Sequence, residues 1–250
     1  MAIDRIEYKY PVAVEDLPRL RRAIAPYVEL DRFTRAGAVN EYTVRSIYFD
    51  TFGLRDYYEK ESGLLRRKKT RVRSYNEYSP GAQVFFEIKR KRDMSISKDR
   101  SPVPFKQLVE LIEGGKGGIG EIAELAQADE VRRFLYHFYR FSLRPTTLVS
   151  YEREAFFCKF RSSLRLTFDK NLRGHPFPAV AELFNDDITP VLPGQCIFEV
   201  KFSGGIPPWL RLILRDFNLS RQAMSKYCIC LEKLGVVEQR SRFSAVAAAR

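Results

Sequence analysis

The sequence contains few of the residues on which many enzymes and metal sites depend. Its 250 residues include two histidines, His137 and His175, and one tryptophan. The cysteines form no Cys-x-x-Cys pair and have no histidine cluster to match; they are Cys158, Cys196, Cys228 and Cys230. This composition disfavours zinc binding and histidine-based catalysis and indicates reduced, mostly buried thiols.

Long apolar runs and a targeting segment are also missing. No stretch approaches the ~18 apolar residues needed to cross a bilayer, and the first twelve residues carry charge on alternate positions. The glycine-rich stretch 114–120 lacks the Gly-Lys-Ser/Thr ending of a nucleotide-binding loop and is interpreted as a linker. We therefore expect a cytoplasmic protein with one domain over 1–236 and a flexible tail over 237–250.

Positive charge is abundant, and much of it lies on alternate residues. The formal net charge is +12. In the segment 83–91 the apolar Val84, Phe86 and Ile88 fall on one strand face, with Glu87, Lys89 and Lys91 on the other. The same alternation groups further polar residues by strand face: Lys69 with Arg71 and Arg73, Tyr151 with Arg153, Arg165 with Asp169, and Glu199 with Lys201. Such segments predict strands with one packed side and one polar side.

Apolar spacing typical of helices occurs in five other segments, which are 15–28, 105–113, 121–141, 207–217 and 222–234. The sequence thus predicts a mainly β protein decorated by outer helices.

Three interpretations of the basic strand faces remain open from the residues alone. The faces could be solvated, could form a nucleic-acid surface, or could converge inside a barrel around a phosphate chain. Glu87 and Glu199 interrupt the basic faces, which would not help a purely electrostatic nucleic-acid groove. Their carboxylates are hard ligands for a divalent cation that bridges phosphate oxygens.

A series of short motifs extends over about residues 5–234 in a consistent order. In sequence they are IEYKY, SIYFDT, TRVR, FEIK followed by SKDR, YEREAF, LRLTFD, FEVK and MSKY. Together they resemble the VTC domain, which is the polyphosphate-polymerase domain of vacuolar transporter chaperone complexes. This domain is a branch of the triphosphate tunnel superfamily.

The resemblance implies a closed antiparallel β-barrel whose tunnel binds ATP or polyphosphate together with Mn²⁺ or Mg²⁺. Residues matched to catalytic positions are Arg71, Arg73, Arg153, Arg165 and Lys226. Residues assigned to substrate binding are Lys9, Lys89, Lys98, Tyr151, Lys201 and Ser225. Glu199, with Glu87, is the expected metal ligand.

Two departures from the family pattern affect the choice of activity. Related triphosphatases begin with Glu-x-Glu-x-Lys, whereas this frame has Arg5, Glu7 and Lys9, which makes triphosphate hydrolysis a weaker expectation. In the polymerases a basic residue precedes the closing Ser-Lys. This sequence has Ala223 at that position, and Arg221 is the candidate substitute.

The leading functional prediction is transfer of the ATP γ-phosphoryl group to a growing polyphosphate chain. The alternatives are a binding module without turnover and a metal-dependent tripolyphosphatase. Nucleic acid is not the expected partner, and a membrane-protein partner is left open.

Overall fold

The computed structural model describes residues 6–36, 39–92, 95–113 and 129–241. In this part of the chain ten strands form a single sheet. The strands are β1 Ile6–Ala13, β2 Val28–Leu30, β3 Tyr42–Asp50, β4 Arg66–Tyr75, β5 Gln83–Arg92, β6 Ser95–Pro104, β7 Arg144–Cys158, β8 Arg161–Pro176, β9 Thr189–Pro190 and β10 Gln195–Phe202.

Helices connect the strands and cover the sheet. The α-helices are α1 Leu17–Ile24, α2 Arg32–Ala36, α3 Arg55–Glu61, α4 Phe105–Glu113, α6 Asp129–Arg140, α7 Pro208–Asp216 and α8 Lys226–Lys233. The 3-10 turns are η1 Val14–Asp16, η2 Ala25–Tyr27 and η3 Val180–Phe184.

The sheet is antiparallel and open, so the prediction of a closed barrel is wrong. Its order is β1-β10-β8-β7-β3-β4-β5-β6, with β2 paired to β7 and β9 to β8. Among the described strands, β1 pairs only with β10 and β6 only with β5. Both edge strands contain proline, at Pro11 and at Pro102 and Pro104. Because proline has no N–H to donate, it suits an edge better than the seam of a closed barrel.

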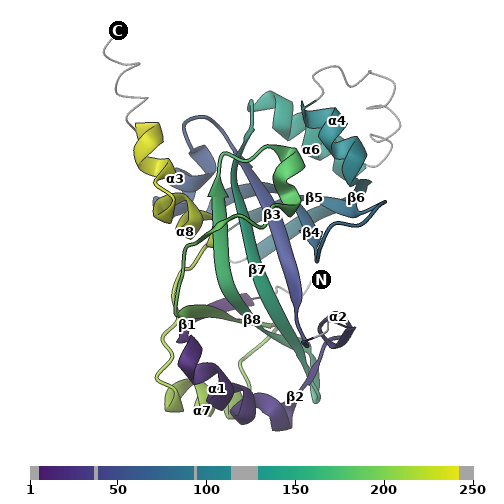
Figure 1. Ribbon diagram of the computed structural model, residues 1–250. Helices are drawn as coiled ribbons and strands as arrows, with labels where there is room; N and C mark the ends of the chain where they lie inside the picture. Colours follow the sequence, from purple (N-terminus) through teal and green to yellow (C-terminus); the bar gives the residue numbers. More distant parts are fainter. Residues whose placement is uncertain (1–5, 37–38, 93–94, 114–128, 242–250) are drawn as a thin grey trace.

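The open sheet nevertheless curls strongly. In Figure 1, β4, β5 and β6 cross the direction of β3, β7 and β8 at a steep angle. Five strands separate β1 from β5 in the sheet order, yet Lys89 Nζ of β5 lies 3.4 Å from a carboxylate oxygen of Glu7 in β1. The face that carries these two side chains is therefore the inside of the curl, and it is called the concave face below.

The opposite, convex face packs against helices in two separate clusters. One cluster joins β1, β8 and β10 to α1 and α7, and includes Leu20, Phe198 and Leu210. The other joins β3 to β6 with α4 and α6, and includes Phe86 and Phe134. Because strand residues alternate between faces, burial of the apolar set on this side directs the polar set to the concave face.

A third cluster places α8 against β7 and β8, next to the concave face. Gly174 of β8 permits this close approach. A Cβ atom at residue 174 would lie 3.0 Å from Leu234 Cδ1, 3.2 Å from Cys230 Sγ and 3.2 Å from the Leu148 carbonyl oxygen. Lys226, the first residue of α8, is thereby held at the concave face.

The predicted helices are found with shifted boundaries. The segment 105–113 matches α4, and 207–217 matches α7 apart from its end residues. The predicted helix 15–28 is divided into η1, α1 and η2, while 222–234 begins as a helix only at Lys226. The predicted helix 121–141 is described from residue 129 as α6, and the linker prediction for 114–120 lies outside the described residues.

Residues 236–241 are helical, and 242–250 lie outside the described part of the chain. The domain boundary at residue 236 and the flexible tail therefore stay predictions. Within the described residues, no helix combines the length and apolar character needed to cross a bilayer. The cellular compartment also stays a prediction.

Candidate phosphate-binding site

The pairing register of the strands collects the basic residues on the concave face. Lys69 lies opposite Lys89, Arg71 opposite Glu87, and Lys9 opposite Glu199. Ten basic side chains of this face are Lys9, Lys69, Arg71, Arg73, Lys89, Lys98, Arg153, Arg165, Lys201 and Lys226. Five carboxylates accompany them: Glu7, Asp31, Glu87, Asp169 and Glu199. In the described part of this face the cations thus outnumber the carboxylates.

Glu199 of β10 is the centre of the first ion-pair group. Its oxygens lie 2.7 Å from Lys201 Nζ, 2.7 Å from Lys226 Nζ, 3.3 Å from Arg153 Nη2 and 3.4 Å from Lys9 Nζ. Burial alone would raise the pKa of Glu199, but the four cations, led by Lys201, hold that pKa well below its usual range. Glu199 therefore stays ionised at neutral pH.

Asp169 of β8 joins this group through two of the same cations. Its oxygens lie 2.6 Å from Arg153 Nε and 2.5 Å from Lys226 Nζ. Burial works against the charge on Lys226, but Asp169 and Glu199 raise the pKa of its ammonium group. The two carboxylates together fix the position of Lys226.

Glu87 of β5 is the centre of a second ion-pair group. It is completely buried and lies 2.6 Å from Arg71, 2.5 Å from Lys98 and 3.5 Å from Arg100. Burial would raise the pKa of Glu87, but Arg71 and the other neighbouring cations lower it. Arg71 also donates to the Tyr48 hydroxyl at 2.8 Å.

Arg73 of β4 differs from these cations because its contacts are with hydroxyl groups. It is 7% exposed and donates to Ser46 Oγ at 3.1 Å and to the Tyr151 hydroxyl at 3.4 Å. Within the described residues no carboxylate lies within ion-pair distance of its guanidinium. A buried arginine without a counter-ion is costly, and an anion bound beside it would remove that cost.

Several lysines of the concave face repel one another. Burial, together with Lys9 and Lys89, lowers the pKa of Lys69. Burial also lowers the pKa of Lys89, and Lys9, Lys201 and Arg71 add to the effect. Lys69 donates to Ser225 Oγ at 2.5 Å rather than to a carboxylate. The free protein therefore holds these ammonium groups closer together than their charges favour.

The structure brings the sequence-predicted site residues to this one face, although their roles stay predictions. Arg165 contacts Asp31 at 2.7 Å and Tyr42 at 3.3 Å. Tyr151 packs beside Lys226, whose Nζ lies 4.7 Å from the ring centre. Ser225 caps α8 by accepting a hydrogen bond from the Cys228 N–H.

Lys69, Asp169, Glu7, Tyr48 and Asp31 were not assigned to the site from the sequence. Alternation had grouped Lys69 with Arg71 and Asp169 with Arg165, which was the available signal for these two residues. No local signal pointed to Asp31, because it reaches Arg165 from the loop between β2 and α2, 134 residues away. Arg221, the candidate substitute for a basic residue at 223, is exposed and stacks 4.6 Å from the Tyr8 ring centre. Tyr8 packs against the convex-face cluster, so Arg221 does not join the concave face.

The carboxylates fit a divalent ion only if phosphate supplies further ligands. In the described residues no three His, Cys, Asp or Glu side chains converge in a way that could hold a metal. Glu7 and Glu199 form one pair of neighbouring carboxylates, because Lys9 Nζ lies 3.3 Å from one and 3.4 Å from the other, and Asp169 also lies near Glu199 through Lys226 Nζ. Mg²⁺ and Mn²⁺ sites built from one or two carboxylates plus substrate phosphates are common. Glu87, surrounded by its own three cations, does not lie in this pair.

The family model of the VTC domain matches residues 4–235 of the chain. The chain belongs to the VTC domain family. The match covers all ten described strands of the sheet and the basic residues of the concave face, including Lys226 at the start of α8. No curated protein matches the sequence.

Two solved structures resemble this VTC domain over most of its length. The PH1819 protein from Pyrococcus horikoshii OT3 has a TM-score of 0.48 and 14% identity, covering 92% of this chain and 99% of its own. HpAC1 from Hippeastrum, described as having a dominant triphosphatase activity, has a TM-score of 0.49 and 12% identity, covering 91% and 95%. At these values neither likeness identifies an activity of this chain.

Proposed function

We propose that this VTC domain binds ATP and polyphosphate on its concave face and transfers the ATP γ-phosphoryl group to the end of the chain. The observation that carries the proposal is the excess of cations over carboxylates on that face, where Arg73 is buried and has no carboxylate partner among the described residues. A phosphate chain supplies several negative charges in a row, which a surface with cations on adjacent strands can contact at several points. Membership in the VTC family supports the same substrate class.

The proposed transfer needs no nucleophile from the protein. A terminal oxygen of the polyphosphate attacks the γ-phosphorus of ATP, a new P–O bond forms, and the bond to the β-phosphate oxygen breaks. The products are ADP and a chain longer by one phosphate. Catalysis then depends on alignment of the two phosphates and on stabilisation of charge spread over the transferred group.

Arginines and lysines of the concave face have distinct parts in this proposal. Arg71 and Arg73, two residues apart on β4, would hold phosphate oxygens through their planar guanidinium groups. Lys226 and Arg153, already oriented by Asp169 and Glu199, would face the transferred group. Lys9, Lys89, Lys98 and Lys201 would hold the rest of the chain.

A divalent metal is the proposed cofactor, with Glu199 and Glu7 as its protein ligands. When bound with the substrate, Mn²⁺ or Mg²⁺ would neutralise phosphate oxygens during transfer. Phosphate would also attract Lys9 and Lys201 away from the carboxylates, which would free carboxylate oxygens for the ion.

Incubation of the purified protein with ATP and Mn²⁺, followed by gel analysis for polymer, tests the proposal. Polymer together with ADP supports a polymerase. Polymer should not form with Arg73→Ala, but it should still form with Arg211→Ala, a variant at an exposed position of α7. Orthophosphate release from tripolyphosphate without polymer would identify a hydrolase instead. Binding of polyphosphate without any turnover would identify a binding module.

A further inference from the structure

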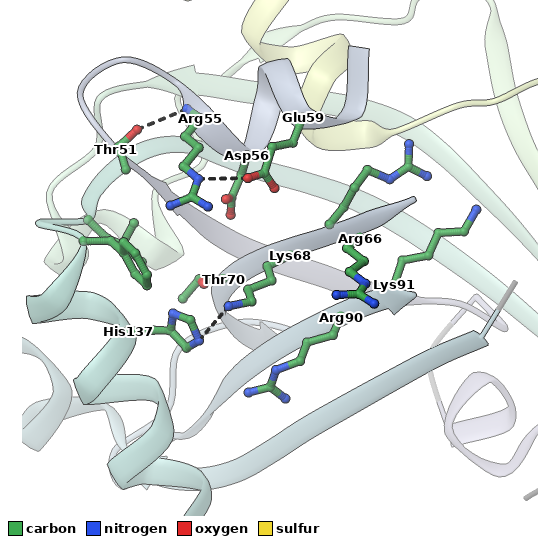
Figure 2. Close-up of a pocket in the computed structure, with 13 residues that line it drawn as sticks. Thr51, Arg55, Asp56, Glu59, Arg66, Lys68, Thr70, Arg90, Lys91 and His137 are labelled. Atoms are coloured by element: carbon green, nitrogen blue, oxygen red, sulfur yellow. Dashed lines mark hydrogen bonds and ion pairs between the residues drawn. The ribbon is translucent and has the colours of Figure 1, made fainter. Parts of the chain in front are cut away.

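A second basic recess lies where β4 begins and β5 ends, beyond Lys69 and Lys89 of the concave face. This cavity of about 260 Å³ is bordered by α3 and α6, and Figure 2 shows basic side chains reaching into it from several elements. Its basic lining residues are Arg55, Arg66, Arg67, Lys68, Arg90 and Lys91.

Acidic groups of the recess do not balance this charge. Glu59 accepts a hydrogen bond from Arg55 at 2.8 Å, as Figure 2 shows. Burial, together with Asp50 and Glu59, raises the pKa of Asp56 to about 8. Asp56 is therefore largely protonated at neutral pH and adds little negative charge.

Four of the cations have no carboxylate partner among the residues that the structure describes. They are Arg66, Arg67, Lys68 and Lys91, whereas Arg90 is paired with Asp99 at 2.5 Å. Lys68 Nζ instead lies 3.3 Å from His137 Nε2. Burial, together with Lys68 and Arg90, lowers the pKa of His137. A neutral imidazole accepts the lysine hydrogen bond but contributes no counter-charge.

The recess is continuous with the concave face through the strand register. Lys69 lies opposite Lys89, Lys68 opposite Arg90, and Arg67 opposite Lys91. Like charges directly opposite one another destabilise a sheet, and here three such pairs follow in succession. Because neighbouring strand residues face opposite sides, Arg67 and Lys91 extend the face of Lys69 and Lys89, whereas Lys68 and Arg90 carry basic charge to the opposite side.

We propose that the recess is a second phosphate-binding subsite, which holds a part of the polyphosphate chain that extends beyond the concave face. The proposal rests on the proposed function and adds a place for the outer end of the chain. Continuity with the concave face favours a phosphate chain over nucleic acid or a lipid surface, because one flexible polyanion can contact both regions at once. Two linked contacts raise the apparent affinity for long chains but not for short ones.

Isothermal titration with tripolyphosphate and with long-chain polyphosphate tests this inference. The informative variant is Arg66→Gln combined with Lys68→Gln, which removes two cations that have no carboxylate partner in the described part of the chain and keeps a similar side-chain length. The matched control is Lys106→Gln combined with Arg211→Gln, two exposed cations on other elements. Thermal melts establish that each protein is folded.

The recess variant should bind long-chain polyphosphate roughly tenfold more weakly than wild type. Its affinity for tripolyphosphate should stay within about twofold of wild type, and the control variant should bind both ligands normally. Unchanged long-chain affinity, or an equal loss for both ligands, would overturn the second subsite. A variant that does not fold would be replaced by Lys68→Gln alone, with the same two outcomes.

The same titrations separate this inference from the proposed function. If Arg73→Ala loses tripolyphosphate binding while the recess variant loses only affinity for long-chain polyphosphate, the proposed function and the second subsite are both supported. If wild type binds neither phosphate ligand, the proposed function fails first. Binding of RNA or of phosphatidylserine vesicles that requires Arg66 and Lys68, and that polyphosphate does not displace, would assign the recess to another partner.

Discussion

Individual charges on the concave face have different tasks, and Glu199 is predicted to have two. It neutralises buried cations in the free protein and is a proposed metal ligand with substrate. Glu199→Gln should destabilise the free protein by about 3–5 kcal/mol, because Lys201 and Lys226 would stay buried without that carboxylate. Turnover should be lost, while phosphate-chain binding should survive in part.

Thermal melts and the ATP assay check this prediction, with the exposed Glu15→Gln as control. Tripolyphosphate should raise the melting temperature of Glu199→Gln more than that of wild type, since it replaces a missing counter-charge. Wild-type stability and activity in Glu199→Gln would refute both assigned tasks.

Tyr48 is predicted to report on the charge around it. Its hydroxyl is buried, which raises its pKa, but Arg71, Arg73 and Lys69 lower the pKa to about 8. The unfolded chain keeps the usual pKa of about 10, so the native state loses this proton first as pH rises. Stability relative to Tyr48→Phe should therefore increase between pH 8 and 10, by up to about 2–3 kcal/mol.

Near-ultraviolet absorbance of tyrosinate measures this ionisation directly. A component that titrates near pH 8 should be present in wild type and missing in Tyr48→Phe. Bound tripolyphosphate should move it to higher pH, because an anion beside Arg71 and Arg73 disfavours a second negative charge. Titration of every tyrosine near pH 10 would contradict the assignment.

At the scale of elements, α8 must pack closely on the sheet for Lys226 to reach Asp169 and Glu199. Gly174→Ala should destabilise the protein by about 1–3 kcal/mol, because the added Cβ lies 3.0 Å from Leu234 and 3.2 Å from Cys230. It should also weaken tripolyphosphate binding if the helix shifts away from β8.

Gly205→Ala is the matched control, since a Cβ at residue 205 meets nothing within 4 Å. Denaturant unfolding and titration of tripolyphosphate check both variants. Equal stability of the two would mean that α8 adjusts freely and that its distance from the sheet does not position Lys226.

Alternation in the sequence was sufficient to predict the main strands and their polar faces. The residues of β4 and β5 show why: apolar Val72, Phe86 and Ile88 pack on the convex side, so Arg71 and Glu87 face the other way. Closure of the sheet could not be predicted in the same way. Alternation specifies which side is buried, whereas closure depends on how the two edge strands meet.

Contacts between distant segments were likewise beyond local sequence patterns. The approach of Glu7 to Lys89 across the curled sheet, and of Asp31 to Arg165, depends on curvature and loop placement. Helix boundaries shifted for local reasons, as where the Ser225 side chain accepts the Cys228 N–H and α8 begins at Lys226.

At the scale of the whole molecule, the fold brings together positive charges that repel in the free protein. A polyanion that binds only the folded state should therefore stabilise it by mass action and relieve this repulsion. At a hundred times its dissociation constant, tripolyphosphate should contribute about 2.7 kcal/mol, which corresponds to roughly 5–10 °C in melting temperature.

Thermal melts at low and high salt test the electrostatic origin of this gain. The shift should shrink as sodium chloride is added, because salt screens exposed charges and competes for the cations. A shift that is missing even at low ionic strength would count against a phosphate site anywhere on this face.

The most direct measurement is isothermal titration of tripolyphosphate into wild type, Arg71→Ala, Arg73→Ala and Arg211→Ala at one salt concentration. The account predicts a loss of roughly ten- to a hundredfold in affinity for Arg71→Ala and Arg73→Ala, since each removes a charge-assisted contact worth ~1.5–3 kcal/mol. Arg211→Ala, on the exposed side of α7, should bind like wild type. Equal, small losses of affinity in all three variants would show that the basic residues act only through their summed surface charge, and would contradict a phosphate-binding concave face.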